Sequence, residues 1–166
     1  IDPILQGRPR AIFLMAGVND LIFSKITPEA LLGQYERLLD RIESESPETE
    51  LFIESLLPLD EPRNTQYFTG KNARIEAFNR LLREMAARRG LVYIDIWSRM
   101  AHKGSMPSEL TVDGIHLNAA GYARWIEALT PYITPAGAPT GPVRCAGRRV
   151  ERGVVRDADR CAVADA

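Results

Sequence analysis

Strand-like and helix-like patterns alternate along most of the chain, and this alternation restricts the possible fold more than any other feature. Short apolar runs typical of strands occur at residues 10–16, 50–56 and 91–96. Apolar residues at the three-to-four spacing of an amphipathic helix occur over residues 28–44, 72–89 and 118–129. This order predicts an α/β fold, in which a parallel sheet has helices on both faces and right-handed crossovers.

Local signals set the limits of these elements. Thr27 can cap the first helix, Pro28 suits its first position, and Gly90 is a stop signal for the second helix. The strand at residues 10–16 has the continuous apolar character of a central strand buried on both faces, and residues 59–70 are expected to form an irregular connection. The expected buried stripe of the last helix consists of Tyr122, Trp125, Ile126 and Leu129.

Length and composition are those of a soluble, single-domain protein. The chain has 166 residues, of which 45% are hydrophobic and 26% charged, and its net charge of −1 gives no reason to propose nucleic acid or an anionic membrane as a partner. No apolar run approaches the roughly 20 residues of a membrane span. We assign residues 1–134 to the domain and leave localisation and oligomeric state open.

The last part of the chain has a different composition. Residues 135–166 are rich in Pro, Gly, Arg and Ala without helical periodicity, so we expect a disordered tail. Cys145 and Cys161 lie in this tail without the spacing of a zinc site, and we expect free thiols rather than a disulfide.

Three strands are few for this kind of domain. A doubly wound sheet commonly has about five, and its central strands need a neighbour on each side. We therefore expect the fold to be truncated at the N-terminal side, with further strands upstream of residue 10.

Two polar motifs occur where such a sheet would place a site. Gly17-Val18-Asn19-Asp20 follows the first strand, at the carboxyl edge where parallel sheets bind ligands. The amide of Asn19 could donate to a developing oxyanion, and Gly17 allows the backbone to approach a substrate closely. Alternatively, Asn19 and Asp20 only turn the chain and cap the segment that follows.

The second motif, Asp113-Gly114-Ile115-His116, precedes the last helix. His116 could take a proton from a hydroxyl group while Asp113 holds the other ring nitrogen and fixes the tautomer. Alternatively, Asp113 and Gly114 form a turn, Asn118 caps the helix, and His116 is an ordinary surface residue.

Together the two motifs resemble the SGNH hydrolase superfamily, also called GDSL esterases and lipases. The run from Asp113 to Tyr122 is particularly similar to bacterial acylhydrolases related to platelet-activating-factor acetylhydrolase and to carbohydrate acetylesterases. The resemblance covers about Arg10 to Ile133 and implies a three-layer α/β/α sandwich around a five-stranded parallel sheet. It also implies that Asn19 is an oxyanion donor, His116 the general base and acid, Asp113 its orienting partner, and Gly17 and Asp20 supporting residues.

The sequence departs from the family in one respect. The family's nucleophile lies in a Gly-Asp-Ser motif upstream of Gly-x-Asn-Asp, and this sequence contains no Gly-Asp-Ser. None of the candidate replacement serines stands in a strand-to-helix turn with a flanking glycine: Ser24, Ser55, Ser105 and Ser108.

Two functions therefore remain open. The first is hydrolysis of small-molecule or carbohydrate esters with short acyl groups, by a serine acyl-enzyme mechanism that requires no cofactor. The second is a catalytically inactive, truncated domain that binds a carbohydrate or a partner. Metal catalysis is not favoured, because His102 and His116 lie in one loop region without a clustered third ligand.

Overall fold

Three parallel strands form the sheet of the protein. The computed structural model describes residues 1–133, in which β1 (Ala11–Leu14), β2 (Glu50–Glu54) and β3 (Val92–Ile94) are arranged in the order β1-β2-β3. All pairs are parallel, with Phe13 opposite Phe52 and Phe52 opposite Val92. The predicted α/β class and parallel sheet are confirmed.

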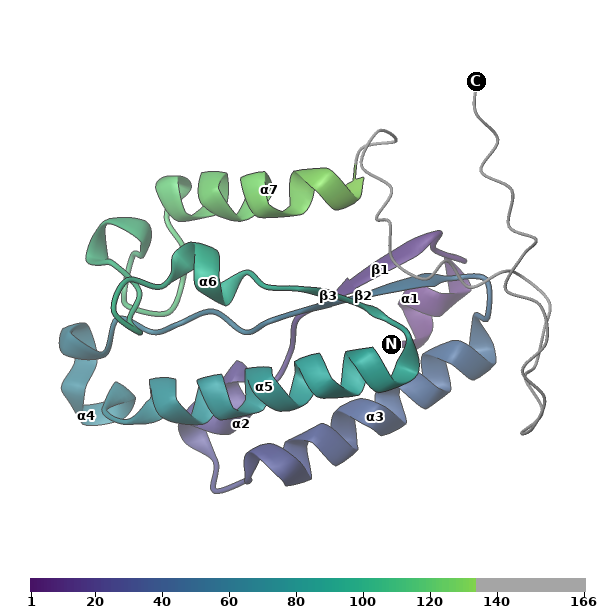
Figure 1. The fold of residues 1–166 in the computed structure, drawn as a ribbon, viewed down its shortest axis with the longest axis horizontal. Helices are drawn as coiled ribbons and strands as arrows, with labels where there is room; N and C mark the ends of the chain where they lie inside the picture. Colours follow the sequence, from purple (N-terminus) through teal and green to yellow (C-terminus); the bar gives the residue numbers. More distant parts are fainter. Residues whose placement is uncertain (134–166) are drawn as a thin grey trace.

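The helices cover both faces of this sheet (Figure 1). One face carries α2 (Val18–Phe23), α3 (Pro28–Glu45) and α5 (Lys71–Arg89), and the other carries α7 (Ala119–Ile133). The short helices outside these layers are α1 (Asp2–Gln6), α4 (Thr65–Phe68) and α6 (Trp97–Met100). The arrangement is a three-layer α/β/α sandwich.

The two long helices form where the sequence signals place them. The hydroxyl of Thr27 accepts a hydrogen bond of 3.2 Å from the backbone N–H of Ala30, and Pro28 occupies the first position of α3. Helix α5 ends at Gly90, whose φ of 64° is the left-handed conformation that a glycine adopts without strain.

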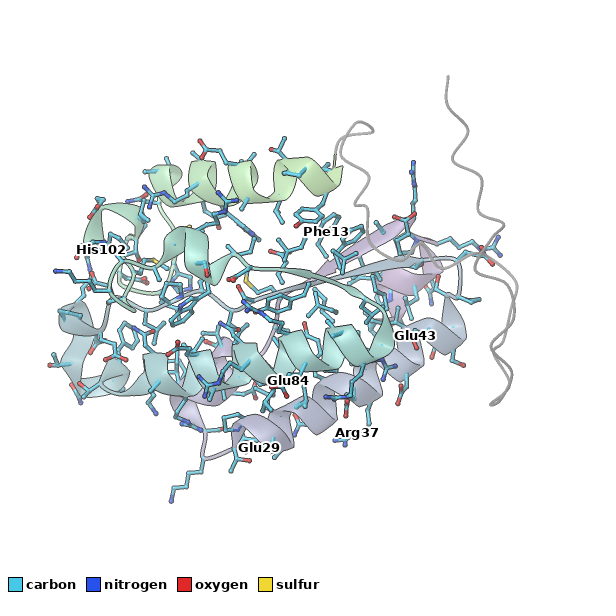
Figure 2. All side chains as sticks on the ribbon, viewed as in Figure 1. Phe13, Glu29, Arg37, Glu43, Glu84 and His102 are labelled. Carbon is cyan, nitrogen blue, oxygen red and sulfur yellow. The ribbon has the colours of Figure 1, made fainter. Side chains whose placement is uncertain are left out.

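A hydrophobic core lies on each side of the sheet. Leu39, Ile53 and Phe78 are fully buried between the sheet and helices α3 and α5. On the other side, Phe13 stacks on Phe52 with ring centroids 4.5 Å apart, and Tyr132 of α7 contacts the edge of Phe52. Figure 2 shows Phe13 between β1 and α7.

The prediction of a central, fully buried first strand is wrong for the part of the chain that the structure describes. Strand β1 is an edge strand there, and all four of its residues are only half-buried. Its apolar sequence is that of a strand with neighbours on both edges, whereas β2 is its one partner within residues 1–133.

The predicted buried stripe of the last helix is also wrong in part. Tyr122 and Ile126 are 50% and 59% exposed, and Trp125 and Leu129 are half-buried. The helix continues through Pro131 to Ile133. It lies over only three strands, which are too few to cover its whole apolar surface.

The connection after β2 is more regular than predicted. It contains a turn of 3-10 helix at Glu61–Asn64, followed directly by α4. Helices of four residues are too short to show the apolar periodicity on which a sequence prediction depends.

The predictions for residues 135–166, including Cys145 and Cys161, lie outside the described residues. Within residues 1–133, no helix combines the length and apolarity needed to cross a membrane.

Candidate active site

The turn between Thr111 and Leu117 brings Asp113 and His116 together. The Nδ1 atom of His116 lies 2.6 Å from Oδ2 of Asp113, and the other carboxylate oxygen accepts the backbone N–H groups of Ile115 and His116 at 3.0 and 2.8 Å. The side chains are 49% exposed for Asp113 and 76% for His116. The pair is therefore formed by the turn itself, at the surface.

The carboxylate determines which ring nitrogen of His116 carries the proton. The backbone N–H of His116 lowers the pKa of Asp113 to about 2, with further contributions from the imidazole and from the N–H of Ile115. Asp113 is therefore ionised at neutral pH and can only accept hydrogen bonds. In the neutral ring, Nδ1 must then be the donor, which leaves the lone pair of Nε2 available to a proton.

A glycine gives this turn its shape. Gly114 has a φ of 100°, and a Cβ atom at this position would lie 2.9 Å from the ring of Phe68. The backbone of Gly114 thus passes closer to α4 than any side chain would permit. Asn118 caps the following helix, as the alternative interpretation of this motif expected, because its side-chain oxygen accepts the N–H of Gly121 at 3.0 Å.

Asn19 and Asp20 lie in the first turn of α2, which begins directly after β1. Gly17 precedes the helix with a φ of 105°, and a Cβ atom there would approach the side chain of Leu31 to 3.0 Å. Neither polar side chain caps α2, and both are exposed. The interpretation of Asn19 and Asp20 as helix caps is thereby wrong, and the amide of Asn19 can contact a ligand.

A small pocket joins the two motifs. It has a volume of about 200 Å³, and Asn19 and His116 contribute to its wall. Gly17, Asp20 and Asp113 do not line it. The remaining lining residues are mostly apolar and come from the carboxyl ends of β1 and β2 and from the turn: Met15, Ala16, Val18, Leu56, Leu57, Pro58, Leu59 and Ile115.

Two asparagines that the sequence analysis missed hold the wall of this pocket. The carboxamide of Asn79 accepts the N–H of Leu56 at 2.8 Å and donates to its carbonyl at 3.0 Å. Asn72 makes the same pair of bonds to Leu59, at 2.7 and 2.9 Å. The two asparagines lie seven residues apart on the apolar face of α5. A polar residue within an apolar stripe is the sequence signal that could have identified them.

The four serines considered as nucleophiles are engaged elsewhere. None of these serines lines the pocket, and each hydroxyl has a hydrogen-bond partner: the carbonyl of Asp20 for Ser24, the N–H of Trp97 for Ser55, the carbonyl of Leu59 for Ser105 and the carboxylate of Asp60 for Ser108. Within residues 1–133, no three His, Cys, Asp or Glu side chains gather as a metal site would require.

The chain matches a known protein family over most of its length. A profile of the GDSL-like lipase/acylhydrolase family matches residues 1–124. The chain belongs to this family. The resemblance given in the sequence analysis is confirmed, and the parent family is a family of ester hydrolases. A search of curated proteins found no match.

Solved structures show the same GDSL hydrolase fold. A structure described as a platelet activating factor from Streptococcus pneumonia is 26% identical, with a TM-score of 0.68 over 74% of this chain and 58% of that one. A GDSL-like lipase from Bacteroides thetaiotaomicron is 15% identical, with a TM-score of 0.69 over 79% and 65%. A carbohydrate esterase family 3 protein from Talaromyces cellulolyticus is 19% identical, with a TM-score of 0.64 over 78% and 59%.

The chain thus spans less than two thirds of the length of these neighbours. The described residues supply three strands, α7 and the long helices of the opposite layer.

Proposed function

We propose that this chain supplies the acid–base and oxyanion-binding groups of a serine-dependent carboxylic ester hydrolase. The observation that carries the proposal is the 2.6 Å contact between Asp113 and His116, on a turn that shares a pocket with Asn19. An ionised carboxylate, an imidazole with a free Nε2 and an amide donor are the groups that acyl transfer requires beside its nucleophile.

We propose the following roles for these groups. A serine hydroxyl attacks the ester carbonyl and gives its proton to Nε2 of His116, while Asp113 stabilises the imidazolium that forms. The amide of Asn19 donates to the oxygen that becomes negative. His116 returns the proton to the departing alcohol, and water then repeats the sequence to release the acid. No cofactor takes part in these steps.

The pocket favours a short acyl group. Its volume of about 200 Å³ lies below the roughly 300–1,000 Å³ of pockets that hold drug-sized ligands. Its apolar wall suits a methyl or short alkyl chain rather than a charged group. An acetyl or similar acyl group on a small molecule or a carbohydrate is therefore the substrate that we propose.

We infer that the nucleophile lies on a segment outside this sequence. Strand β1 has an open edge within the described part of the fold, and Tyr122 and Ile126 of α7 are exposed. A strand added to this edge and a helix laid on α7 would cover both surfaces. Such a segment, carrying Gly-Asp-Ser, would place its serine at the carboxyl edge of the sheet.

The test is esterase activity of the protein expressed with the reading frame that precedes Ile1. We expect cleavage of p-nitrophenyl acetate, and a loss of about 10²–10⁴-fold in kcat for His116→Ala, because a general acid–base group contributes that much. The matched control is His102→Ala, which removes the second of the two histidines of the chain. Absence of cleavage, or equal activity of the two variants, would contradict the enzyme proposal.

A second candidate function rests on the missing motif. Because the sequence contains no Gly-Asp-Ser and the four hydroxyls are engaged elsewhere, an inactive domain that binds a carbohydrate or a partner is the alternative. A start codon close to Ile1, together with binding of an acetylated oligosaccharide without cleavage, would favour it. An upstream Gly-Asp-Ser would favour the enzyme.

A further inference from the structure

The turn that carries Asp113 and His116 is closed by a hydroxyl that the proposed chemistry does not use. Thr111 is buried, with 4% of its surface exposed. Its Oγ1 atom donates to the carbonyl of His116 at 2.7 Å and accepts the N–H of Gly114 at 2.9 Å. One side chain thus ties the middle of the turn to its end.

A second attachment comes from the connection after β2. The Nη2 atom of Arg63 donates to the carbonyl of Val112 at 2.6 Å, and the backbone N–H of Asp60 donates to the carbonyl of Gly114 at 2.9 Å. This connection thus bonds two further carbonyls of the turn.

These attachments matter because the catalytic side chains are not held by packing. With 49% and 76% of their surfaces exposed, Asp113 and His116 can rotate into water. Their contact depends on the backbone of the turn, since two of the three bonds to the carboxylate come from N–H groups within it. Gly114, at a φ of 100°, would otherwise sample many conformations.

We propose that Thr111 and Arg63 are positioning residues for the Asp113–His116 pair. The inference rests on the proposed function, because it is the acid–base role that makes the geometry of the pair matter. Thr111 fixes the carbonyl of His116 and the N–H of Gly114, and Arg63 fixes the carbonyl of Val112. Neither residue touches a reacting atom.

The pKa of Asp113 reports directly on this geometry. Hydrogen bonds from the turn hold it at about 2, below the ordinary 3.8, so an opened turn raises it. We would titrate the Asp113 carboxyl by NMR in the full chain, in Thr111→Val and in Arg63→Met. Thr111→Val keeps the shape of the side chain and removes its hydroxyl, whereas Arg63→Met keeps an unbranched chain and removes the guanidinium; we expect the pKa of Asp113 to rise toward 3.8 in each.

Matched variants separate positioning from stability. Thr111→Ser keeps the hydroxyl and should keep the low pKa of Asp113. Thr130→Val removes a hydroxyl that bonds the carbonyl of Ile126 within α7, and should leave the pKa unchanged. Arg37→Met, on the exposed side of α3, serves the same purpose for arginine. A purely structural role would lower the melting temperature of Thr111→Val without moving the pKa.

An unchanged pKa of Asp113 in folded Thr111→Val and Arg63→Met would overturn the proposal. If Thr111→Val does not fold, the exposed Arg63 decides the question alone. The titration needs neither a serine nor a substrate, so an inactive protein would refute the proposed function and leave this result standing. In an active protein, the same variants should lower kcat with KM unchanged.

Discussion

Replacing Gly121 with alanine tests how closely α7 is seated on the segment before the catalytic turn. Gly121 is buried in the first turn of the helix. A Cβ atom there would lie 2.3 Å from the carbonyl oxygen of Leu110 and 2.9 Å from the side chain of Leu117. The Leu110 oxygen also accepts the N–H of Asn118, so it cannot yield without disturbing the start of the helix.

Two opposing terms determine the size of the effect. Alanine in a helix is favoured over glycine by about 1 kcal/mol, whereas an extra methyl group in a packed site costs about 1–3 kcal/mol. The backbone oxygen must retreat by about 1 Å to restore an ordinary contact of 3.4 Å, which places the cost at the upper end of that range. We expect Gly121→Ala to lower the free energy of unfolding by about 1–2 kcal/mol.

The control is Gly33→Ala in α3. A Cβ atom at Gly33 would meet only the end of the Arg37 side chain, at 3.8 Å, so this variant should gain up to about 1 kcal/mol. Urea unfolding followed by circular dichroism measures both changes in the free energy of unfolding, from the shift of the urea midpoint at an unchanged dependence of stability on urea. If Gly121→Ala were as stable as Gly33→Ala, the close seating of α7 on Leu110 would be refuted.

Three further variants test the buried polar groups and the turn. Burial raises the pKa of the Glu54 carboxyl, which accepts the indole N–H of Trp125 at 2.8 Å, so ionisation costs stability as the pH rises through the folded-state pKa. Glu54→Gln should therefore have a higher melting temperature than the wild type at alkaline pH. A difference in melting temperature that is the same at acidic and alkaline pH would contradict this. Asp113 has a lowered pKa, so its contribution is present above pH 3.8 and is lost as the pH falls toward 2, and Asp113→Asn should lose less stability over that interval in acid-unfolding curves. Asn79→Leu leaves the buried N–H and carbonyl of Leu56 without partners and should lower the free energy of unfolding by about 2–4 kcal/mol, as measured by urea unfolding. Unchanged stability of this variant would contradict the expectation.

The fold could be predicted where the determining interactions are local. Helices α3 and α5 are long enough to show an apolar period, and Thr27 and Gly90 mark their ends within a residue or two. The strands were placed correctly for the same reason. Short helices such as α4 could not be found, because they form through contacts with the rest of the fold.

The faces of β1 and α7 could not be predicted from the same patterns. The apolar residues of β1 indicate a strand with two neighbours, and Tyr122 and Ile126 have the spacing of a buried stripe. Both patterns are those of residues suited to burial, whereas their actual burial depends on how many strands the sheet contains. Three strands leave these residues half-buried or exposed.

The candidate site also has features that could be predicted from the sequence and features that could not. Asp113 and His116 are three residues apart with a glycine between them, so their contact is local; the spacing allowed it, and the family resemblance favoured it over an unpaired surface histidine. That Asn19 shares their pocket depends on the parallel sheet, which brings the ends of β1 and β2 to one edge. Asn72 and Asn79 interrupt the apolar face of α5, but their partners are backbone groups of a distant segment, which the sequence does not identify.

The exposure of the acid–base pair indicates what the rest of the site must provide. The attraction between two charges about 4 Å apart is about 1 kcal/mol in water and several times larger where water is excluded. His116 is 76% exposed in the described structure, so Asp113 stabilises an imidazolium only weakly there. A segment that brings the serine to Nε2 of His116 would also displace this water. The same contact would thus supply the nucleophile and strengthen the attraction between Asp113 and the imidazolium, so we expect His116→Ala to lower kcat in the protein that contains the serine.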